Sequence, residues 1–122
     1  MLTVWREPVG HVPYCIGVDT AEGLIHGDYS CAQVLEVRTG EQVAVWHGHI
    51  PPDDFANDIY LLSLWYNDAL TCVESNNHGL TTITQLRHLG APNLFRKRSL
   101  NQATTKVSQE FGWKTTRTTK PL

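Results

Sequence analysis

YCIGVDTAEGLIHGDYS, residues 14–30, is the stretch that decides the fold. It begins with a short apolar run rich in β-formers, residues 14–18, which predicts a strand buried on both faces. Asp19 follows at the carboxyl end of that strand. An ionised carboxylate at the rim of a core costs several kcal/mol unless it meets a cation, backbone N–H groups or water. Asp19 therefore either caps the loop that leaves the strand or binds a ligand.

A second apolar run ends in the same way: in LTCVESNNHG, residues 70–79, Glu74 follows the predicted strand and a polar turn comes next. Ligands of open α/β sheets collect outside the carboxyl ends of parallel strands, so two such strands side by side would bring Asp19 and Glu74 to one place. Two carboxylates about 4 Å apart repel each other by roughly 4 kcal/mol at an effective dielectric constant of 20. Protonation of one carboxylate or a bound divalent cation relieves this repulsion. All-oxygen ligation favours magnesium or manganese over zinc.

The segment between the two acidic strands predicts a hairpin and a crossover helix. Residues 29–37 and 42–50 are two β-rich runs, and the turn RTGE at 38–41 places a glycine where a left-handed residue is needed. Two prolines then stop the strand, and either Asp53 or Asp54 is expected to cap a helix over residues 54–66. This helix is the crossover that makes the second acidic strand parallel to the first. Its expected buried face carries four residues at helical spacing with an aromatic beside them: Phe55, Ile59, Leu62 and Tyr66, with Trp65.

A second helix is expected after Glu74, with Asn77 as its cap and its end near residue 89, before Gly90. Its inward residues are predicted to be Leu80, Ile83 and Leu86. Residues 93–96 read as a fifth short strand, and residues 97–122 are expected to be loop-like around Phe111 and Trp113.

Size and composition indicate one small soluble domain. The chain has 122 residues, 41% of them hydrophobic and 18% charged, and it contains no apolar run of about 20 residues and no long apolar N-terminal core. These features predict a cytoplasmic protein with no membrane association. Residues 1–12 are expected to be a lead-in or linker and residues 13–122 the domain. The three cysteines are odd in number and widely spaced, which predicts free, buried thiols rather than disulfides: Cys15, Cys31 and Cys72.

The net charge of −2 conceals an asymmetry between the two parts of the chain. Residues 1–89 carry three basic and eleven acidic side chains, a net charge of −8, whereas residues 90–122 carry seven basic and one acidic, a net charge of +6. A basic segment beside an acidic metal site suits a protein that holds phosphates. The alternative is that these basic side chains, among them Arg96, Lys97 and Arg98, are solvated only.

Several motifs together resemble the nuclease domain of the large terminase subunit of tailed bacteriophages. They are GVDTAEG, GDYS, WYNDALTCVESNNHG, GAPNLFRKR and FGWKTTRTTKP, which cover residues from about 13 to 122 in that family's order and spacing. The resemblance implies an α/β, ribonuclease H-like fold, with helices flanking a mixed five-stranded sheet. In that fold the first and fourth strands are parallel neighbours, which places Asp19 beside Glu74.

The resemblance also implies an activity: a metal-dependent endonuclease that cuts double-stranded concatemeric DNA by two-metal phosphodiester hydrolysis. Asp19 and Glu74 would be the catalytic residues and would bind two divalent cations, magnesium or manganese. Asp28 is a possible further metal ligand, with a turn residue as the alternative. His78 is expected to contact DNA or to orient Glu74, unless it is only a surface histidine near a helix cap, and three basic residues would bind DNA: Arg96, Lys97 and Arg98.

The sequence departs from this family in two respects. The third metal-binding acid is expected beyond Leu122, and no GxxxxGK[ST] phosphate-binding loop occurs. The chain therefore resembles a truncated domain whose C-terminal part is missing, and whether it is active alone stays open. A missing helix would leave one sheet face exposed.

The implied setting is the cytoplasm of the bacterial host, where the partners would be an upstream ATPase domain, a portal protein and a small terminase subunit. Two alternatives compete with the terminase nuclease. One is a non-catalytic remnant that keeps the fold and binds DNA. The other is a different ribonuclease H-like nuclease, such as a resolvase or transposase.

Overall fold

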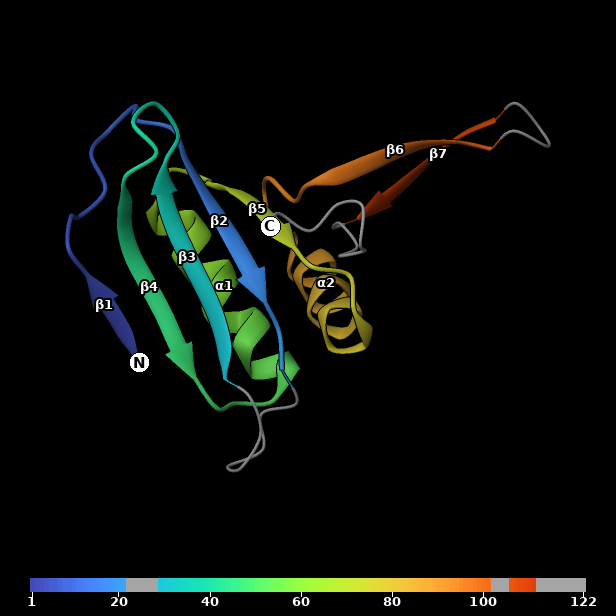
Figure 1. Ribbon diagram of the computed structural model, residues 1–122, viewed down its shortest axis with the longest axis horizontal. Helices are drawn as coiled ribbons and strands as arrows, with labels where there is room; N and C mark the ends of the chain where they lie inside the picture. The colour runs from blue at the N-terminus through green and yellow to red at the C-terminus, as the bar shows by residue number, and fades with distance from the viewer. Residues whose placement is uncertain (22–28, 102–105, 112–122) are drawn as a thin grey trace, which may run out of the picture.

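The computed structural model describes residues 1–21, 29–101 and 106–111, and its strands and helices follow one another along the chain as Figure 1 shows. In chain order they are β1 (Leu2–Val4), β2 (Tyr14–Asp19), β3 (Ser30–Glu36), β4 (Gln42–Gly48), α1 (Pro52–Trp65), β5 (Leu70–Val73), α2 (Asn77–Leu89), β6 (Arg96–Asn101) and β7 (Lys106–Phe111). In the part of the chain that is described, no helix is both long and apolar enough to cross a membrane.

The central sheet has five strands in the order β1-β4-β3-β2-β5. Strands β2 and β5 are parallel, while the other neighbours are antiparallel, so the predicted mixed five-stranded α/β sheet is confirmed. The strands at the two edges of the sheet differ from the prediction. Strand β1, which lies in the expected lead-in, pairs with β4 as the fifth strand. The predicted strand at 93–96 is reduced to one parallel bridge between Leu94 and Thr71. The Thr71 N–H donates a hydrogen bond of 2.8 Å to the Asn93 carbonyl oxygen, and the Phe95 N–H donates one of 2.8 Å to the Thr71 carbonyl oxygen.

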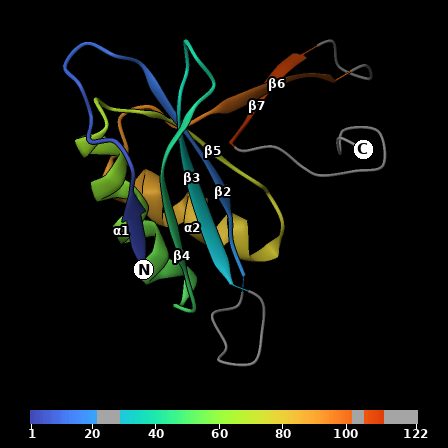
Figure 2. The ribbon, with the colours of Figure 1, turned by 60° about the vertical axis from the view of Figure 1, so that its left-hand side comes forward.

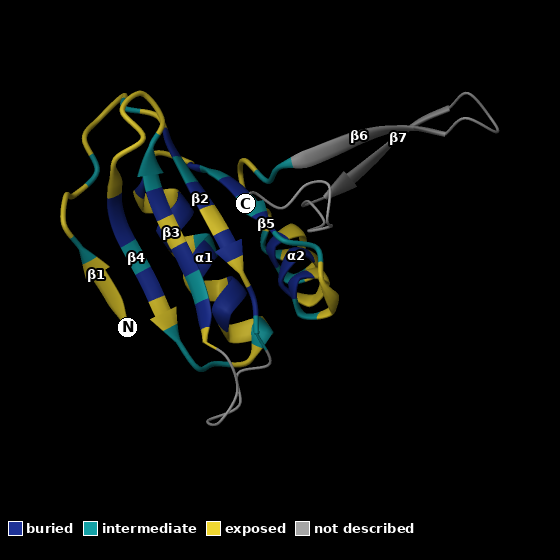
Figure 3. Cartoon of the chain, in the orientation of Figure 1, coloured by how far each residue is buried: buried dark blue, intermediate teal, exposed yellow. Residues whose placement is uncertain are grey.

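Both helices cover the same face of the sheet (Figures 1 and 2). Residues of β2 that point to the helices, such as Ile16 and Val18, are buried, whereas Gly17 and Asp19 on the other face are exposed. Figure 3 shows this alternation along β2 and β3. The prediction that the first acidic strand is buried on both faces is therefore wrong. Among the described residues, the second face, here called the open face, has no helix over it.

Helix α1 packs on the sheet through the apolar stripe that its spacing predicted. Phe55, Ile59 and Tyr66 are fully buried, and the Tyr66 hydroxyl donates a hydrogen bond of 2.8 Å to the carbonyl oxygen of Arg6. Trp65, in contrast, is 45% exposed, so its assignment to the core is wrong.

The start of α1 also differs from the prediction that Asp53 or Asp54 is its cap. The cap position is Pro51, which makes no side-chain hydrogen bond, and the two aspartates lie in the first turn. Pro52 occupies the first helical position, where its fixed φ is already helical and its missing N–H is not needed. The two prolines therefore begin the helix earlier than the acids would, and the acids instead face its positive end.

The predicted hairpin joins β3 and β4, and Gly40 adopts the expected left-handed conformation with φ of 71°. Strands β6 and β7 pair as a separate two-stranded ribbon that projects away from the central sheet in Figures 1 and 2. Residues 97–101 and 106–111 are thus strand rather than loop, which corrects the prediction, while Trp113 lies outside the described residues.

Helix α2 begins at Asn77 and ends before Gly90, which is left-handed with φ of 77°. Its cap is Asn76 rather than Asn77: the Asn76 Oδ1 accepts a hydrogen bond of 2.7 Å from the Gly79 N–H. Ile83 is buried as predicted, but Leu80 is 50% exposed, so its inward assignment is wrong. Leu86 is buried as well.

Replacement of Asn76 by alanine is expected to lower the free energy of unfolding by about 1 kcal/mol, because the Gly79 N–H loses its side-chain acceptor. Urea unfolding followed by circular dichroism measures the loss. The matched control is Asn77→Ala, which removes an exposed asparagine from the next position. An equal loss in both variants would show that the Asn76 cap contributes nothing specific.

The three cysteines are free, as predicted. They are half-buried rather than fully buried, since all of them lie on strands whose side chains alternate between the two faces.

Candidate active site

Strand register places Asp19 next to Glu74. Val18 of β2 is the partner of Val73 of β5, and the Glu74 N–H donates a hydrogen bond of 3.0 Å to the Val18 carbonyl oxygen. Asp19 and Glu74 each follow these partners by one residue, and adjacent strands lie about 4.8 Å apart. The two carboxylates that the sequence predicted to meet are therefore neighbours at the carboxyl end of the parallel pair.

Both carboxylates line one open groove of about 670 Å³ on the open face of the sheet. Asp19 is exposed there and Glu74 is half-buried. The groove is formed by the ends of β2, β3 and β5, with the lining residues Gly17, Val18, Asp19, Cys31, Gln33, Leu35 and Glu74.

The strand end that carries Asp19 is held by its two following residues. The buried Thr20 hydroxyl donates a hydrogen bond of 3.2 Å to the hydroxyl of Thr82 on α2. The Ala21 N–H donates one of 2.9 Å to the hydroxyl of Ser30, at the start of β3. These bonds connect the end of β2 to α2 on one side and to β3 on the other, so they fix the backbone that carries Asp19.

Glu74 is positioned by the close approach of α2. Gly79 is buried, and a Cβ atom added there would overlap the carbonyl oxygen of Glu74 and lie 3.0 Å from its carbonyl carbon. Only a residue without a side chain lets the first turn of α2 pack so tightly on the end of β5. Gly79 therefore fixes how far Glu74 stands from the helix.

Burial raises the pKa of the Cys31 thiol in this groove. A hydrogen bond from Gln33 works in the opposite direction, and the negative charge of Asp19 raises the pKa further. The thiol is therefore neutral near pH 7, and the charge of Asp19 acts directly on it. The anionic donors of the groove are oxygens, not sulfur.

This donor set fits a hard divalent cation. Two carboxylates beside an open groove match the preference of magnesium for one or two carboxylates while it keeps several waters. Among the described residues, no group of three or more His, Cys, Asp or Glu side chains is arranged to hold a metal ion. The described residues thus bring two carboxylates together at this groove.

The other predicted site residues are not among the described residues that line this groove. Asp28 lies outside the described residues. His78 is half-buried in the first turn of α2, close along the chain to Glu74. The three basic residues 96–98 belong to β6, whose ribbon pairs with no strand of the central sheet, and their side chains lie outside the description: Arg96, Lys97 and Arg98.

Sequence reasoning missed Cys31 and Gln33, which form the β3 side of the groove. The alternation of β3 was visible in the sequence, but its register with β2 was not. That register pairs Asp19 with Cys31 and Gly17 with Gln33.

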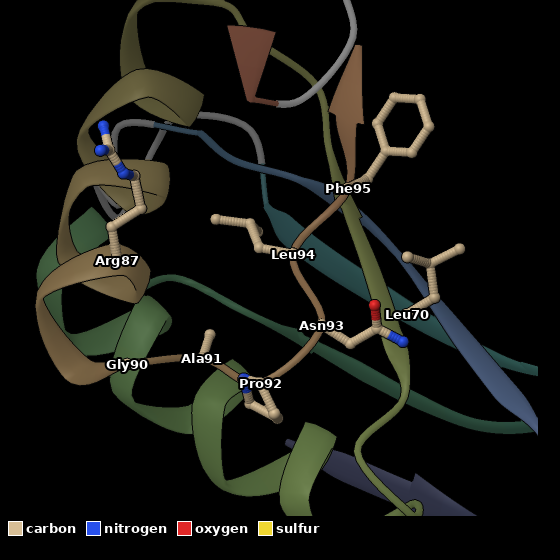
Figure 4. Close-up of a pocket in the computed structure, with 8 residues that line it drawn as sticks. All are labelled: Leu70, Arg87, Gly90, Ala91, Pro92, Asn93, Leu94 and Phe95. Atoms are coloured by element: carbon tan, nitrogen blue, oxygen red, sulfur yellow. The ribbon is translucent and has the colours of Figure 1, made fainter. Parts of the chain in front are cut away.

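A second hollow of about 590 Å³ lies where the chain leaves α2 and approaches β5 (Figure 4). Leu94 lies there on the segment that joins α2 to β6, and Arg87 on α2 provides the charged side chain. None of the described residues that line this hollow is acidic. Because a magnesium-type cation is bound mainly through carboxylates, the groove at Asp19 is the better candidate for a metal site.

Solved structures of phage large terminase nucleases have the same fold as this chain. Those of the large terminase nuclease from thermophilic phage G20c with bound cobalt and with bound magnesium each match with a TM-score of 0.66 and 22% sequence identity. The match covers 75% of this chain and 47% or 48% of the nuclease, so the chain spans about half its length. The Thermus phage P74-26 large terminase nuclease domain matches with a TM-score of 0.52 and 16% identity, over 88% of this chain and 74% of that domain.

No protein-family model and no curated protein matches the chain. The likeness to the terminase nucleases confirms the predicted resemblance at the level of the fold, which is ribonuclease H-like.

Proposed function

We propose that this chain is the core of a metal-dependent endonuclease domain of a viral DNA-packaging terminase. The observation that carries the proposal is the placement of Asp19 and Glu74, one residue beyond the paired Val18 and Val73, at one end of one groove. The fold shared with nucleases whose structures contain cobalt, magnesium or zinc supports it. The substrate would be double-stranded concatemeric DNA.

The residues of the groove have distinct roles in this proposal. The exposed Asp19 and the half-buried Glu74 would hold the cations, with Glu74 at the second coordination position. Two divalent ions, when bound, supply a hydroxide nucleophile and stabilise the leaving oxygen of the phosphodiester. The chain supplies their position, since Thr20 and Gly79 fix the strand ends that carry the two acids. Magnesium or manganese is the proposed metal, because the anionic donors are carboxylate oxygens.

Further residues extend the site in this proposal. Asp28 would be an additional ligand, and His78 would contact a phosphate or orient Glu74 from the first turn of α2. The β6 ribbon would hold the DNA backbone through its basic residues Arg96, Lys97 and Arg98. The third metal-binding acid, the ATPase domain, the portal protein and the small terminase subunit would come from outside this chain.

A non-catalytic, DNA-binding remnant is the second candidate function. It is favoured by one observation: within the described residues, no three metal-ligating side chains converge. The two functions differ in their dependence on metal. A remnant would bind DNA through its basic residues with a steep dependence on salt, without cation binding and without cleavage.

Manganese titration of the full 122-residue chain by calorimetry, paired with a plasmid-nicking assay, separates the two functions. A nuclease core is expected to bind manganese saturably, with magnesium competing for the same site. Nicking that depends on the cation would show that the two acids suffice for hydrolysis. If no binding is detected at millimolar manganese, either for the chain or for a longer protein that contains it, the nuclease proposal is wrong.

A further inference from the structure

Three rings gather on the open face at the end of the sheet that carries Asp19. Tyr29 immediately precedes β3, and its ring centroid lies 4.2 Å from that of His47 on β4, with an angle of 26° between the ring planes. The ring of His49, just beyond β4, lies 3.8 Å from that of Tyr29 at 41°. These residues are called the ring cluster below. Packed rings have few alternative rotamers, so the cluster presents its polar atoms in fixed directions.

Strand register places the ring cluster in line with the candidate active site. Asp19 of β2 pairs with Cys31 of β3, and Cys31 pairs with His47 of β4. Directly paired residues point to the same face of a sheet, so Asp19, Cys31 and His47 form one row across three strands. At about 4.8 Å between neighbouring strands, His47 stands roughly 10 Å from Asp19.

The exposed members of the ring cluster are hydrogen-bond donors, and no bond from either side chain to another described residue is seen. Tyr29 is 52% exposed and His47 is exposed. In the described ranges, neither the Tyr29 hydroxyl nor the His47 ring has a hydrogen-bond partner. His49 differs: it is half-buried, and its Nδ1 is buried without a partner, so its contact with the cluster is the stack on Tyr29.

The arrangement of the rings does not suit a metal ion. The His47 ring stacks on the phenol ring and the His49 ring lies against it at a tilt, so each imidazole contacts Tyr29 through its ring rather than converging with the other through its nitrogens. An anion with several oxygens fits better, because an O–H and a ring N–H donate to it side by side. Tyrosine is among the side chains that contact the phosphates of bound DNA, and an imidazole N–H is a hydrogen-bond donor of the same kind.

We propose that Tyr29 and His47 bind a backbone phosphate of the DNA, with His49 as the residue that positions Tyr29. This inference rests on the proposed nuclease function, and it adds a contact on the β3–β4 side of the groove. At roughly 10 Å from Asp19, the bound phosphate would be a near neighbour of the phosphodiester bond at Asp19 rather than that bond itself. The ring cluster would thus set the direction in which the bound duplex extends from Asp19 and Glu74.

Binding of a short fluorescein-labelled DNA duplex to the full chain, in EDTA so that no cleavage occurs, tests the proposal. Tyr29→Phe keeps the stack and removes only the hydroxyl, and His47→Ala removes the second donor. Each is expected to raise Kd about threefold to tenfold, the range for loss of one hydrogen bond. The matched control is His88→Ala, an exposed histidine in the last turn of α2, which is expected to leave Kd unchanged.

His49 is tested by rescue. His49→Ala is expected to weaken duplex binding because Tyr29 loses its stacking partner, whereas His49→Phe keeps a ring there and is expected to restore affinity. A purely structural role would lower the melting temperature in both variants without this difference in Kd. Equal affinity of His49→Ala and the unaltered chain contradicts the positioning role.

Manganese calorimetry on the same variants separates this inference from the nuclease proposal. Tyr29→Phe and His47→Ala are expected to bind manganese like the unaltered chain. If manganese binds but both variants also bind duplex like His88→Ala, the phosphate site is wrong and the nuclease proposal stands. If manganese does not bind yet the variants lose duplex affinity, the phosphate site stands and the nuclease proposal fails. Absence of any duplex binding by the unaltered chain also overturns the phosphate site.

Discussion

Asp19→Asn is expected to lower the affinity of the chain for manganese by about 100-fold or more and to abolish metal-dependent nicking. Loss of residues that only support metal ligands already costs about 10-fold to 100-fold in affinity, and Asp19 is proposed as a ligand itself. The amide keeps the size of the side chain but has no negative charge, so the repulsion from Glu74 that a cation relieves is also gone. Calorimetry and the plasmid assay measure both effects.

The same substitution is expected to change the unfolding midpoint in EDTA only slightly, because Asp19 is exposed and its replacement by asparagine removes a charge and no core packing. This combination separates a lost ligand from a damaged fold. The matched control is Asp58→Asn on the exposed side of α1, which changes the net charge equally and lies away from the groove. Manganese affinity that is the same in both variants would show that Asp19 binds no metal.

Gly79→Ala is expected to lower the free energy of unfolding by about 3 kcal/mol, the upper part of the range for overpacking a tight site. The added Cβ would overlap the carbonyl oxygen of Glu74. Helix propensity alone predicts the opposite sign, because alanine is favoured over glycine inside a helix by about 1 kcal/mol. Chemical unfolding therefore decides between the local preference and the contact with β5.

Manganese affinity is expected to fall together with stability in Gly79→Ala, since relief of the overlap must move either α2 or Glu74. Gly10→Ala serves as the control: a Cβ atom there meets nothing within 4 Å, and its backbone is not left-handed. A stabilised Gly79→Ala protein with unchanged manganese affinity would show that the end of β5 adapts freely to the helix.

The convergence of the two acids could be predicted from the sequence because it depends on few facts. Each apolar run ends in one acid, and a helix of sufficient length lies between a predicted hairpin and the second run. A right-handed crossover then makes the two strands parallel. The register of Val18 with Val73 agrees with this reasoning, since it brings Asp19 level with Glu74.

The predictions that failed depended on small offsets or on which face a residue occupies. The helical spacing predicts that Leu80 points inward. In the structure, Gly79 packs closely on Glu74, so the buried face of α2 contains Gly79 and Thr82, and Leu80 is 50% exposed. The sequence predicts burial of this face of β2 because Cys15 and Gly17 are apolar or small. Apolar character does not require burial, and a sheet with helices on one side leaves such residues half-covered.

The remaining parts of the site need contacts that no single segment encodes. Cys31 and Gln33 reach the groove only through the register of β3 with β2. The ring cluster depends on a further register, that of β3 with β4, which brings His47 opposite Cys31. Turn chemistry predicts that a hairpin forms, but the row in which two side chains meet follows from the final pairing of the strands.

The parallel pairing of β2 with β5 also bears on the order of events during folding. The β3–β4 hairpin closes a short loop, whereas β5 can join β2 only after the hairpin and α1 have been laid down between them. Such non-local pairing forms slowly, because much chain entropy is lost before its contacts form. A partly folded chain in which β2 has paired with β3 but not yet with β5 would hold Asp19 without Glu74. Under the proposed nuclease function, hydrolysis would require the completed sheet, so a nascent chain would leave DNA intact.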